Sequence, residues 1–201
     1  MNPRISSVAI AADNSTIAVT MNEAVYNATG GSGALAVSDF SLTLSDGAAT
    51  LSSATPSSIS ASGNVYTLGM SISGTPTGYE QITVTPVDNS IYDATDNEAS
   101  TSQLMNQAYL HDKVGPTITG TGSPAEDNST IAVSFSDPVY NTSGGSGALE
   151  TSDFALSISG GVATLSSATP TSIAVSGVIY TLGIGLTGTA NGTETITITP
   201  V

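Results

Sequence analysis

The chain contains one stretch of sequence twice, and this duplication constrains the fold more than any other feature. Residues 13–87 return as residues 127–201 at a constant offset of 114 positions, without a gap. Of the 75 aligned positions, 47 are identical. A period this long exceeds that of solenoid repeats, about 20–50 residues, and matches a whole small domain of about 100 residues. The sequence therefore predicts two tandem copies of one domain, residues 1–113 and 114–201.

Within each copy the hydrophobic pattern is typical of short β-strands. Residues 16–21 and 40–44 alternate apolar and polar side chains, as half-buried strands do. Further strands are expected at residues 5–11, 49–51, 58–61, 65–72, 81–84 and 107–111. No segment has a convincing helical stripe, and residues 100–110 are the only candidate. Seven or more short strands separated by turn residues favour an all-β sandwich over the alternative, an up-and-down barrel.

The charge of the chain is strongly unbalanced. Sixteen Asp and Glu residues are opposed by one Arg and one Lys, which gives a net charge of −14. The second copy has neither Lys nor Arg, so its carboxylates must be solvated, bonded to backbone N–H groups or bound to cations. Because no basic patch is available, nucleic-acid binding is excluded and anionic membrane surfaces are disfavoured.

The residue types also indicate a cellular location. The chain has no Cys, which excludes disulfides, thiolate metal sites and a Cys nucleophile. No signal peptide or transmembrane run is visible, so we expect no membrane insertion. Only 9% of the residues are charged, and Gly, Ser, Thr and Asn take the surface positions instead. We expect an extracellular or cell-surface protein, of which this chain would be a fragment if the parent is exported.

Two short motifs resemble those of a known family. The run Phe135-Ser-Asp-Pro-Val139 and its partner Met21-Asn-Glu-Ala-Val25 resemble the F-S-E-P-V signature of bacterial immunoglobulin-like (Ig-like) repeats, which occur in large surface adhesins and S-layer-associated proteins. Residues 92–97 resemble the D-x-x-G-N signature that precedes the last strand there, although Asp96 replaces the usual Gly. The resemblance implies two tandem Ig-like β-sandwich domains that space or present something on a cell surface. It implies no chemistry.

The two copies differ in how far they extend. Copy one continues past Val87 for 26 residues, whereas copy two stops at Val201. The second domain is therefore expected to lack its last strand, and the open sheet edge this leaves invites pairing. Either a boundary cuts the domain arbitrarily, or a neighbouring copy of the repeat or chain supplies the strand, as in donor-strand assembly. A fold that closes differently is the third possibility.

The densest acidic cluster, residues 88–98, is the best candidate for a metal site. Oxygen ligands at this density suit Ca²⁺, although the spacing is not that of an EF-hand. In an Ig-like domain the end of the second strand and the start of the last strand lie at the same pole, which brings Glu23 to this cluster. The alternative is that these carboxylates cap turns or are solvated. The predicted ligands of this site are Glu23, Asp88, Asp93, Asp96 and Asn97.

Two weaker sites complete the candidates. By the same topology Asp112 in the linker and Asp137 could share a cation that stiffens the joint between the domains. Tyr26 and Tyr140 precede the Gly-rich loops of the two copies and could contact a glycan, although a Tyr that anchors a loop is the simpler interpretation. The single His111 lies in the linker without a nucleophile motif, and the chain has no Trp to line a sugar-cleaving cleft.

These patterns favour a structural protein over an enzyme. The leading hypothesis is a spacer module of a repetitive extracellular adhesin or surface fibre. Rigidification by Ca²⁺ and polymerisation by strand complementation are two further expectations within this hypothesis. Its partners would be neighbouring copies of the same repeat. The alternative is a glycan-binding module that uses the Gly-rich loops.

Overall fold

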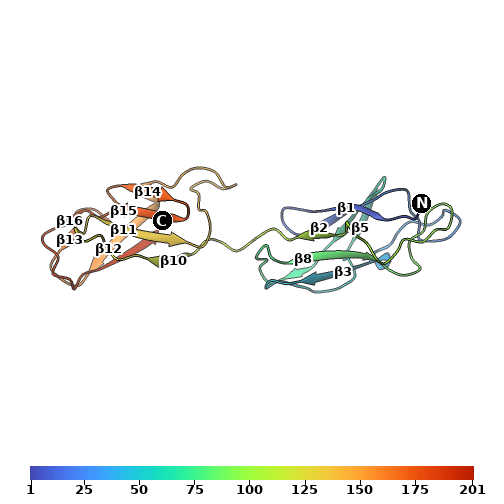
Figure 1. Cartoon of the computed structure of the whole chain (residues 1–201), viewed down its shortest axis with the longest axis horizontal. Coiled ribbons are helices and arrows are strands. Elements are labelled where there is room, and N and C mark those ends of the chain that lie inside the picture. The colour runs from blue at the N-terminus through green and yellow to red at the C-terminus, as the bar shows by residue number, and fades with distance from the viewer. The chain divides into compact units, whose positions relative to one another are not determined.

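A computed structural model describes all 201 residues and divides the chain into two compact units, Met1–Val114 and Gly115–Val201. Regular structure in both units is β-strand, apart from two short 3-10 turns at Val37–Asp39 and Thr151–Asp153 (Figure 1). The all-β sandwich prediction is thus confirmed. No helix has the length and apolar character needed to cross a membrane.

Unit 1 is a sandwich of two antiparallel sheets. Its strands are β1 (Ile5–Ile10), β2 (Thr16–Met21), β3 (Phe40–Ser45), β4 (Thr50–Leu51), β5 (Ile59–Ser62), β6 (Val65–Gly69), β7 (Ile72–Ser73), β8 (Gln81–Pro86) and β9 (Gln107–Tyr109). One sheet has the order β1-β2-β6-β5, the other has the order β3-β8-β9, and β4 pairs with β7 separately. Without the β4–β7 pair, this is the A-B-E-D and C-F-G strand order of an Ig constant-type sandwich.

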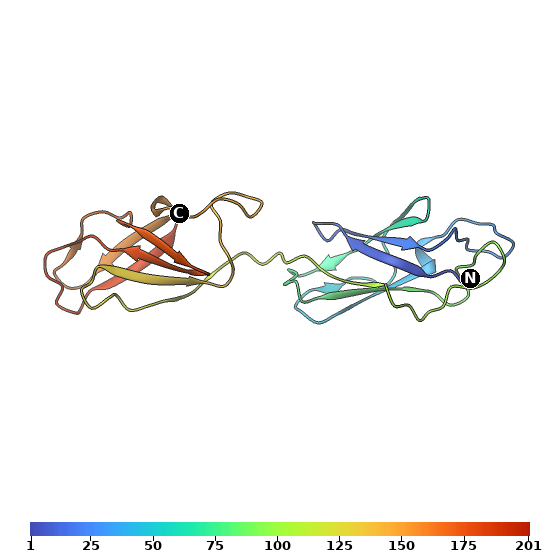
Figure 2. The same cartoon turned by 45° about the horizontal axis from the view of Figure 1, so that its top comes forward.

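Unit 2 repeats this arrangement with one strand fewer. Figure 2 shows that its regular structure is again made of strands. Its strands are β10 (Ile118–Thr121), β11 (Thr130–Phe135), β12 (Phe154–Ser159), β13 (Thr164–Leu165), β14 (Ile173–Ser176), β15 (Ile179–Gly183), β16 (Leu186–Thr187) and β17 (Thr195–Pro200). The sheets are β10-β11-β15-β14 and the pair β12-β17, with β13 paired to β16. The pairing register is preserved, since Phe154 faces Pro200 as Phe40 faces Pro86.

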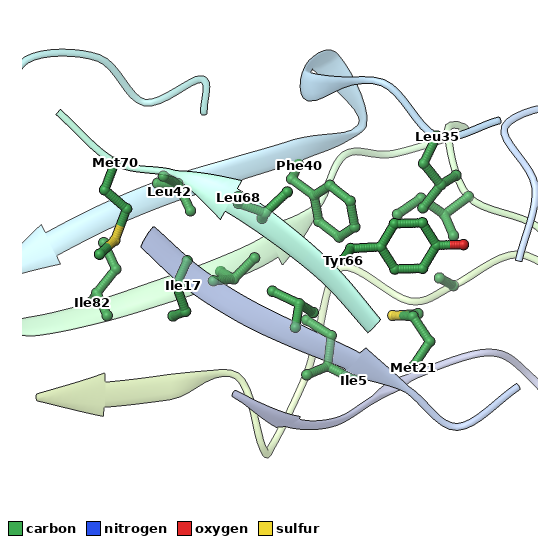
Figure 3. Packing of buried hydrophobic residues seen from close by; sticks show 14 of the residues in the cluster. Ile5, Ile17, Met21, Leu35, Phe40, Leu42, Tyr66, Leu68, Met70 and Ile82 are labelled. Carbon is green, nitrogen blue, oxygen red and sulfur yellow. The ribbon is translucent and has the colours of Figure 1, made fainter. Parts of the chain in front are cut away.

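The core of unit 1 lies between its two sheets, and the period-2 pattern of the sequence creates it. In β2 the inward residues Ile17, Val19 and Met21 are buried while Thr16, Ala18 and Thr20 are only half-buried. Residues from β3, β6 and β8 close on the same space (Figure 3). The rings of Phe40 and Tyr66 pack at 6.1 Å between centroids. This facing of apolar residues is what makes the expected half-buried strands stable.

The expected strands are found with small shifts of their ends. The last strand of unit 1 was expected at residues 107–111 and is observed as β9. The expected strand at residues 65–72 is divided into β6 and β7, which pair with different partners. The segment between Val87 and β9 crosses the end of the sandwich as a loop with isolated bridges, and it carries the candidate acidic site.

Candidate functional site

Asp93 is the centre of the acidic loop. Its side chain is only 4% exposed. Its Oδ1 accepts hydrogen bonds from the Thr95 N–H (2.8 Å), the Thr95 hydroxyl (2.9 Å) and the Asn97 N–H (2.9 Å). Its Oδ2 accepts one from the Asn97 side-chain amide at 2.8 Å. The bond from the Asn97 side chain is the strongest influence on the pKa of Asp93, and together these donors hold that pKa below its usual value although burial opposes them.

Asp96 joins the acidic loop to the Gly-rich loop. It has a left-handed backbone conformation with φ of +67°, the region where glycine is normally found, and this is the position at which the resembling family has Gly. The Asp96 Oδ1 accepts the N–H of Gly30, and a Cβ placed on Gly31 would lie 3.4 Å from the Ala94 Cα. Asp96 therefore adopts the backbone conformation of this turn and adds a contact between the two loops.

The expectation that Glu23 shares a pole with the acidic loop agrees with the backbone pairing. Tyr26 and Tyr92 exchange N–H to C=O hydrogen bonds of 2.8 Å in both directions. The segment that follows Glu23 therefore lies beside the loop. The carboxylate of Glu23 itself accepts a bond from the Asn22 side chain at 3.1 Å and is not hydrogen-bonded to Asp93 or Asp96.

The other predicted ligands also accept local hydrogen bonds. Asp88 accepts from the Asn89 side chain (2.8 Å), Asp112 from the Val114 N–H (2.8 Å) and Asp137 from the Ser136 hydroxyl (2.7 Å). Asp112 belongs to unit 1 and Asp137 to unit 2. The structure contains no group of three or more His, Cys, Asp or Glu side chains arranged to hold a metal ion. Calcium binding, including a cation shared by Asp112 and Asp137, stays a prediction.

A buried carboxylate that the sequence analysis missed is the best-defined polar feature of unit 1. Glu80 is 0% exposed and accepts hydrogen bonds from the N–H groups of Ala48 (2.8 Å), Ala49 (3.0 Å) and Thr77 (2.9 Å). Burial alone raises the pKa of Glu80, but these N–H donors outweigh it and lower the pKa to about 2. A Cβ on Gly47 would lie 2.2 Å from the carboxyl carbon, so the adjacent turn requires glycine.

Unit 2 repeats this carboxylate. Glu194 accepts from the N–H groups of Val162 (2.9 Å) and Ala163 (3.1 Å) and from the loop at Asn191. These donors lower the pKa of Glu194 to about 2 although burial opposes them. The duplication contains a signal that could have revealed this pair. Glu80 and Glu194 occupy equivalent positions of the two copies, and so do Gly47 and Gly161. An ionised carboxylate with its lone pairs occupied by N–H donors fixes two loops and has no proton to exchange near neutral pH.

The predicted glycan contacts differ between the units. Tyr26 is half-buried and paired with Tyr92, whereas Tyr140 is 51% exposed. Tyr140 lines a pocket of about 410 Å³ in unit 2, together with Phe135, Val139 and Phe154. The pocket combines an apolar floor with an exposed ring at its edge. Glycan binding at the Gly-rich loops stays a prediction.

Comparison with known proteins identifies no family. No family model matches the chain, and no curated protein matches it. Among solved structures it is similar to the N-terminal part of the bacterial S-layer protein SbsC, at 18% identity and a TM-score of 0.40. That similarity covers all of this chain and 44% of the SbsC chain.

Proposed function

We propose that the chain is a structural module of a repetitive cell-surface protein, in which Ig-like β-sandwich units serve as spacers and perform no catalysis. The observation that carries the proposal is that one 75-residue scaffold is folded twice. The identical positions include core residues such as Phe40 and Leu68 and turn-fixing residues such as Glu80. Because the core residues and the turn-fixing residues are the same in both copies, both units keep the same shape. A constant shape is the property that a spacer requires.

Surface location is tested by labelling cells that produce the protein. An antibody raised against the chain should label intact cells, and external protease should remove the label. Labelling that appears only after the cells are permeabilised would contradict the proposal. An antibody against a cytosolic protein serves as the control for intact membranes.

The proposal includes calcium binding: the acidic loop would bind a Ca²⁺ ion, and the bound ion would stiffen unit 1. Asp88, Asp93 and Asp96 place several carboxylate oxygens on one loop, which is the ligand chemistry that Ca²⁺ prefers. To bind an ion, Asp93 would have to exchange some of its four hydrogen bonds for the metal. A ligand that binds only the folded state raises stability by about 2.7 kcal/mol at a hundredfold excess over Kd.

The calcium test is a thermal melt in EDTA and then in millimolar Ca²⁺. We expect Tm to rise by several degrees with Ca²⁺, and the double substitution Asp93→Ala/Asp96→Ala to abolish the rise. Asp46→Ala, on an exposed turn of the same unit, is the matched control and should retain it. An unchanged Tm in the parent chain would leave a spacer without calcium.

Assembly by strand complementation would be the means by which such modules extend into a fibre. Growth of the apparent mass of the chain with rising concentration would support this part of the proposal, and a chain that stays monomeric at every concentration would contradict it.

A further inference from the structure

The outer face of the β3-β8-β9 sheet in unit 1 carries no charge. Unit 1 contains ten Asp and Glu residues, one Arg and one Lys, and none of them belongs to β3, β8 or β9. In β8 the buried residues Ile82 and Val84 point into the core, so Gln81, Thr83 and Thr85 point outward. A strongly acidic chain therefore presents one sheet face on which every outward side chain is neutral.

Two exposed tyrosines lie at one end of this face. Tyr109 in β9 is 61% exposed and pairs with Gln81, whose side chain points outward. Tyr79 is 75% exposed and lies two residues before Gln81, while Glu80 between them is buried. The Leu110 N–H donates to the Glu80 C=O, so the β8–β9 register continues past Gln81. The two tyrosines are therefore diagonal neighbours, about 7–8 Å apart, which is within reach of aromatic side chains.

Hydrogen-bonding side chains continue from the rings across the sheet. Thr83 pairs with Gln107 on one side and with Thr43 on the other. The Gln107 side-chain amide donates to the Thr83 hydroxyl at 3.2 Å, which holds Gln107 against the face while its side-chain oxygen can accept another bond. Gln81 adds a second amide in the next row. These groups offer both donors and acceptors without a charge.

A cavity of about 380 Å³ lies at the opposite edge of the sheet, beside Thr43. It is lined by residues of β3 and β4, among them Leu42, Leu44, Thr50 and Leu51. Three neighbouring strands span about 10 Å, since adjacent strands lie about 4.7–4.9 Å apart. The rings, the amides and the cavity therefore form one continuous strip across the sheet.

The duplicated block shows that the fold does not require the ring and the amide. Tyr79 corresponds to Thr193 of unit 2, and Gln81 corresponds to Thr195. Thr195 begins β17, which keeps the register of β8. Unit 1 thus has an aromatic ring and an amide where the same scaffold folds with two Thr residues. A role in binding accounts for side chains that the shape of the scaffold does not require.

We propose that this strip of unit 1 binds the chain of a neutral polysaccharide. Exposed aromatic rings stack on the C–H faces of sugar rings, and amide and hydroxyl side chains exchange hydrogen bonds with sugar hydroxyls. The uncharged face matches an uncharged ligand, whereas the net charge of −14 repels acidic polymers. An extended polymer can cross the open face, and the cavity beside Thr43 would receive one of its sugar rings. The inference adds a binding activity to the spacer role and does not depend on it.

Other macromolecules fit this face less well. Protein interfaces have an apolar core, whereas the outward residues of β3 and β8 are Ser, Thr and Gln. Nucleic acids require Lys and Arg to replace their counterions, and the face has neither. A sugar polymer needs only rings and neutral hydrogen-bonding groups, which are what the face provides.

The experiment is native electrophoresis of the full chain in gels that contain a dissolved polysaccharide. At least one of the neutral polymers hydroxyethylcellulose, galactomannan, glucomannan and laminarin should slow the chain. Alginate and polygalacturonate, which are acidic, should not. Calorimetry with the retarding polymer should give the same affinity at low and at high salt and in EDTA, because an uncharged ligand is not subject to screening.

Single substitutions locate the binding site. Tyr109→Ala and Tyr79→Thr should each weaken binding by about three- to tenfold, because each removes one stacking ring. Tyr79→Thr introduces the residue found at position 193 of unit 2, so the fold should remain intact, and an unchanged Tm verifies this. Tyr140→Ala removes an exposed ring of unit 2 and is the matched control, which should bind like the parent chain.

Amide NMR signals map the contacted face. An oligosaccharide cut from the retarding polymer should shift the signals of Gln81, Thr83 and Tyr109 and, at the cavity, that of Thr50. The signals of β2, in the other sheet of unit 1, should stay unchanged. Shifts confined to the other sheet or to unit 2 would show that the face is wrongly assigned.

Further results would overturn the inference. These are the absence of retardation by every neutral polymer, or parental affinity in both Tyr79→Thr and Tyr109→Ala. Binding that EDTA abolishes would assign the polysaccharide to the acidic loop, and binding that only Tyr140→Ala abolishes would assign it to unit 2. Self-association that Tyr109→Ala abolishes would assign the face to a second copy. Cell labelling, which tests the proposed function, is independent of these results, so either proposal can fail while the other stands.

Discussion

The two units share a scaffold but differ in how the ends of the core are closed. The strand order through β8 in unit 1 is the strand order through β17 in unit 2. Glu80 is fully buried, whereas Glu194 is half-buried, and Val25 and Val139 differ in the same way. The duplicated residues thus contain β2 to β8 in unit 1 and β11 to β17 in unit 2, with the same order and register, whereas the edge strands β1 and β10 precede them. In unit 1 the core also includes Ile91, Ala99 and Leu110, which lie outside the duplicated block.

Unit 2 also differs inside its core. Phe135 replaces Met21, and its ring lies 6.2 Å from that of Phe154 and 5.7 Å from that of Tyr180, edge-on to the latter. Unit 1 has only the Phe40–Tyr66 pair at this position. Aromatic pairs of this geometry contribute about 0.5–1.5 kcal/mol beyond the area they bury. The aromatic centre of unit 2 is therefore denser than that of unit 1.

The largest effect is expected from removing the anchor that closes unit 1. Ile91 is 0% exposed and belongs to the core cluster of unit 1, so Ile91→Ala leaves a cavity in that core, and such substitutions cost about 2–5 kcal/mol. Urea unfolding followed by amide NMR signals should show unit 1 weakened by this amount and unit 2 unchanged. Val162→Ala, at a highly exposed position of unit 2, is the control and should leave both units unaffected. If both units weaken equally, segment 88–113 does not act on unit 1 alone.

A smaller effect is expected at the buried carboxylate. In Glu80→Gln an amide NH₂ replaces a carboxylate oxygen beside the N–H groups of Ala48, Ala49 and Thr77, and the unfolding free energy of unit 1 should fall by about 1–3 kcal/mol. Glu194→Gln should cost unit 2 less because that side chain is partly solvated.

The same carboxylates predict the pH dependence. Their folded pKa values, about 2, lie below the ordinary value of 4.5, so the stability they contribute is present above pH 4.5 and is lost as pH falls towards 2. Urea titrations at pH 6, 4 and 2.5 should show this loss in both units of the parent chain. In Glu80→Gln the loss should be reduced in unit 1 alone, and an unreduced loss there would assign the acid sensitivity to other groups.

The sequence predicted the strands well because each depends on a local alternation that a sandwich satisfies directly. Residues 16–21 have apolar side chains at every second position, and β2 has the same bounds. The role of Glu80 was not predicted, because a Glu before a strand is normally exposed and two of its three N–H donors, Ala48 and Ala49, lie 32 and 31 residues away in the sequence. The role of Asp93 was left open for a different reason. Carboxylate oxygens that bind Ca²⁺ and carboxylate oxygens that cap a turn have the same composition and spacing, so only the hydrogen bonds of the folded chain distinguish them.

A matched pair of Asn residues tests the difference between the units more finely. Gly accepts the left-handed backbone of Asn14 and Asn128 without strain, so Asn→Gly at either position removes little except the side chain. Asn14→Gly removes two hydrogen bonds to His111 and should cost unit 1 about 1 kcal/mol. Asn128→Gly should change unit 2 by only a few tenths. If both cost the same, the bonds to His111 do not stabilise the chain.

The smallest net effect is expected at Asp96, where two contributions oppose each other. Asp96→Gly relieves a left-handed conformation that costs an L-residue roughly 1–2 kcal/mol, but it loses the bond to the Gly30 N–H, worth about 0.5–1.5 kcal/mol. The unfolding free energy should therefore change by less than about 1 kcal/mol. Asp96→Asn separates the contributions, because Asn tolerates the same backbone and retains an acceptor without the charge. Faster amide exchange at Gly30 in the Gly variant, with the Asn variant in between, would show that this side chain holds the Gly-rich loop against the acidic loop. Equal exchange in all three chains would show that the Tyr26–Tyr92 pair alone joins the loops, and Asp96 would then be free to bind a cation.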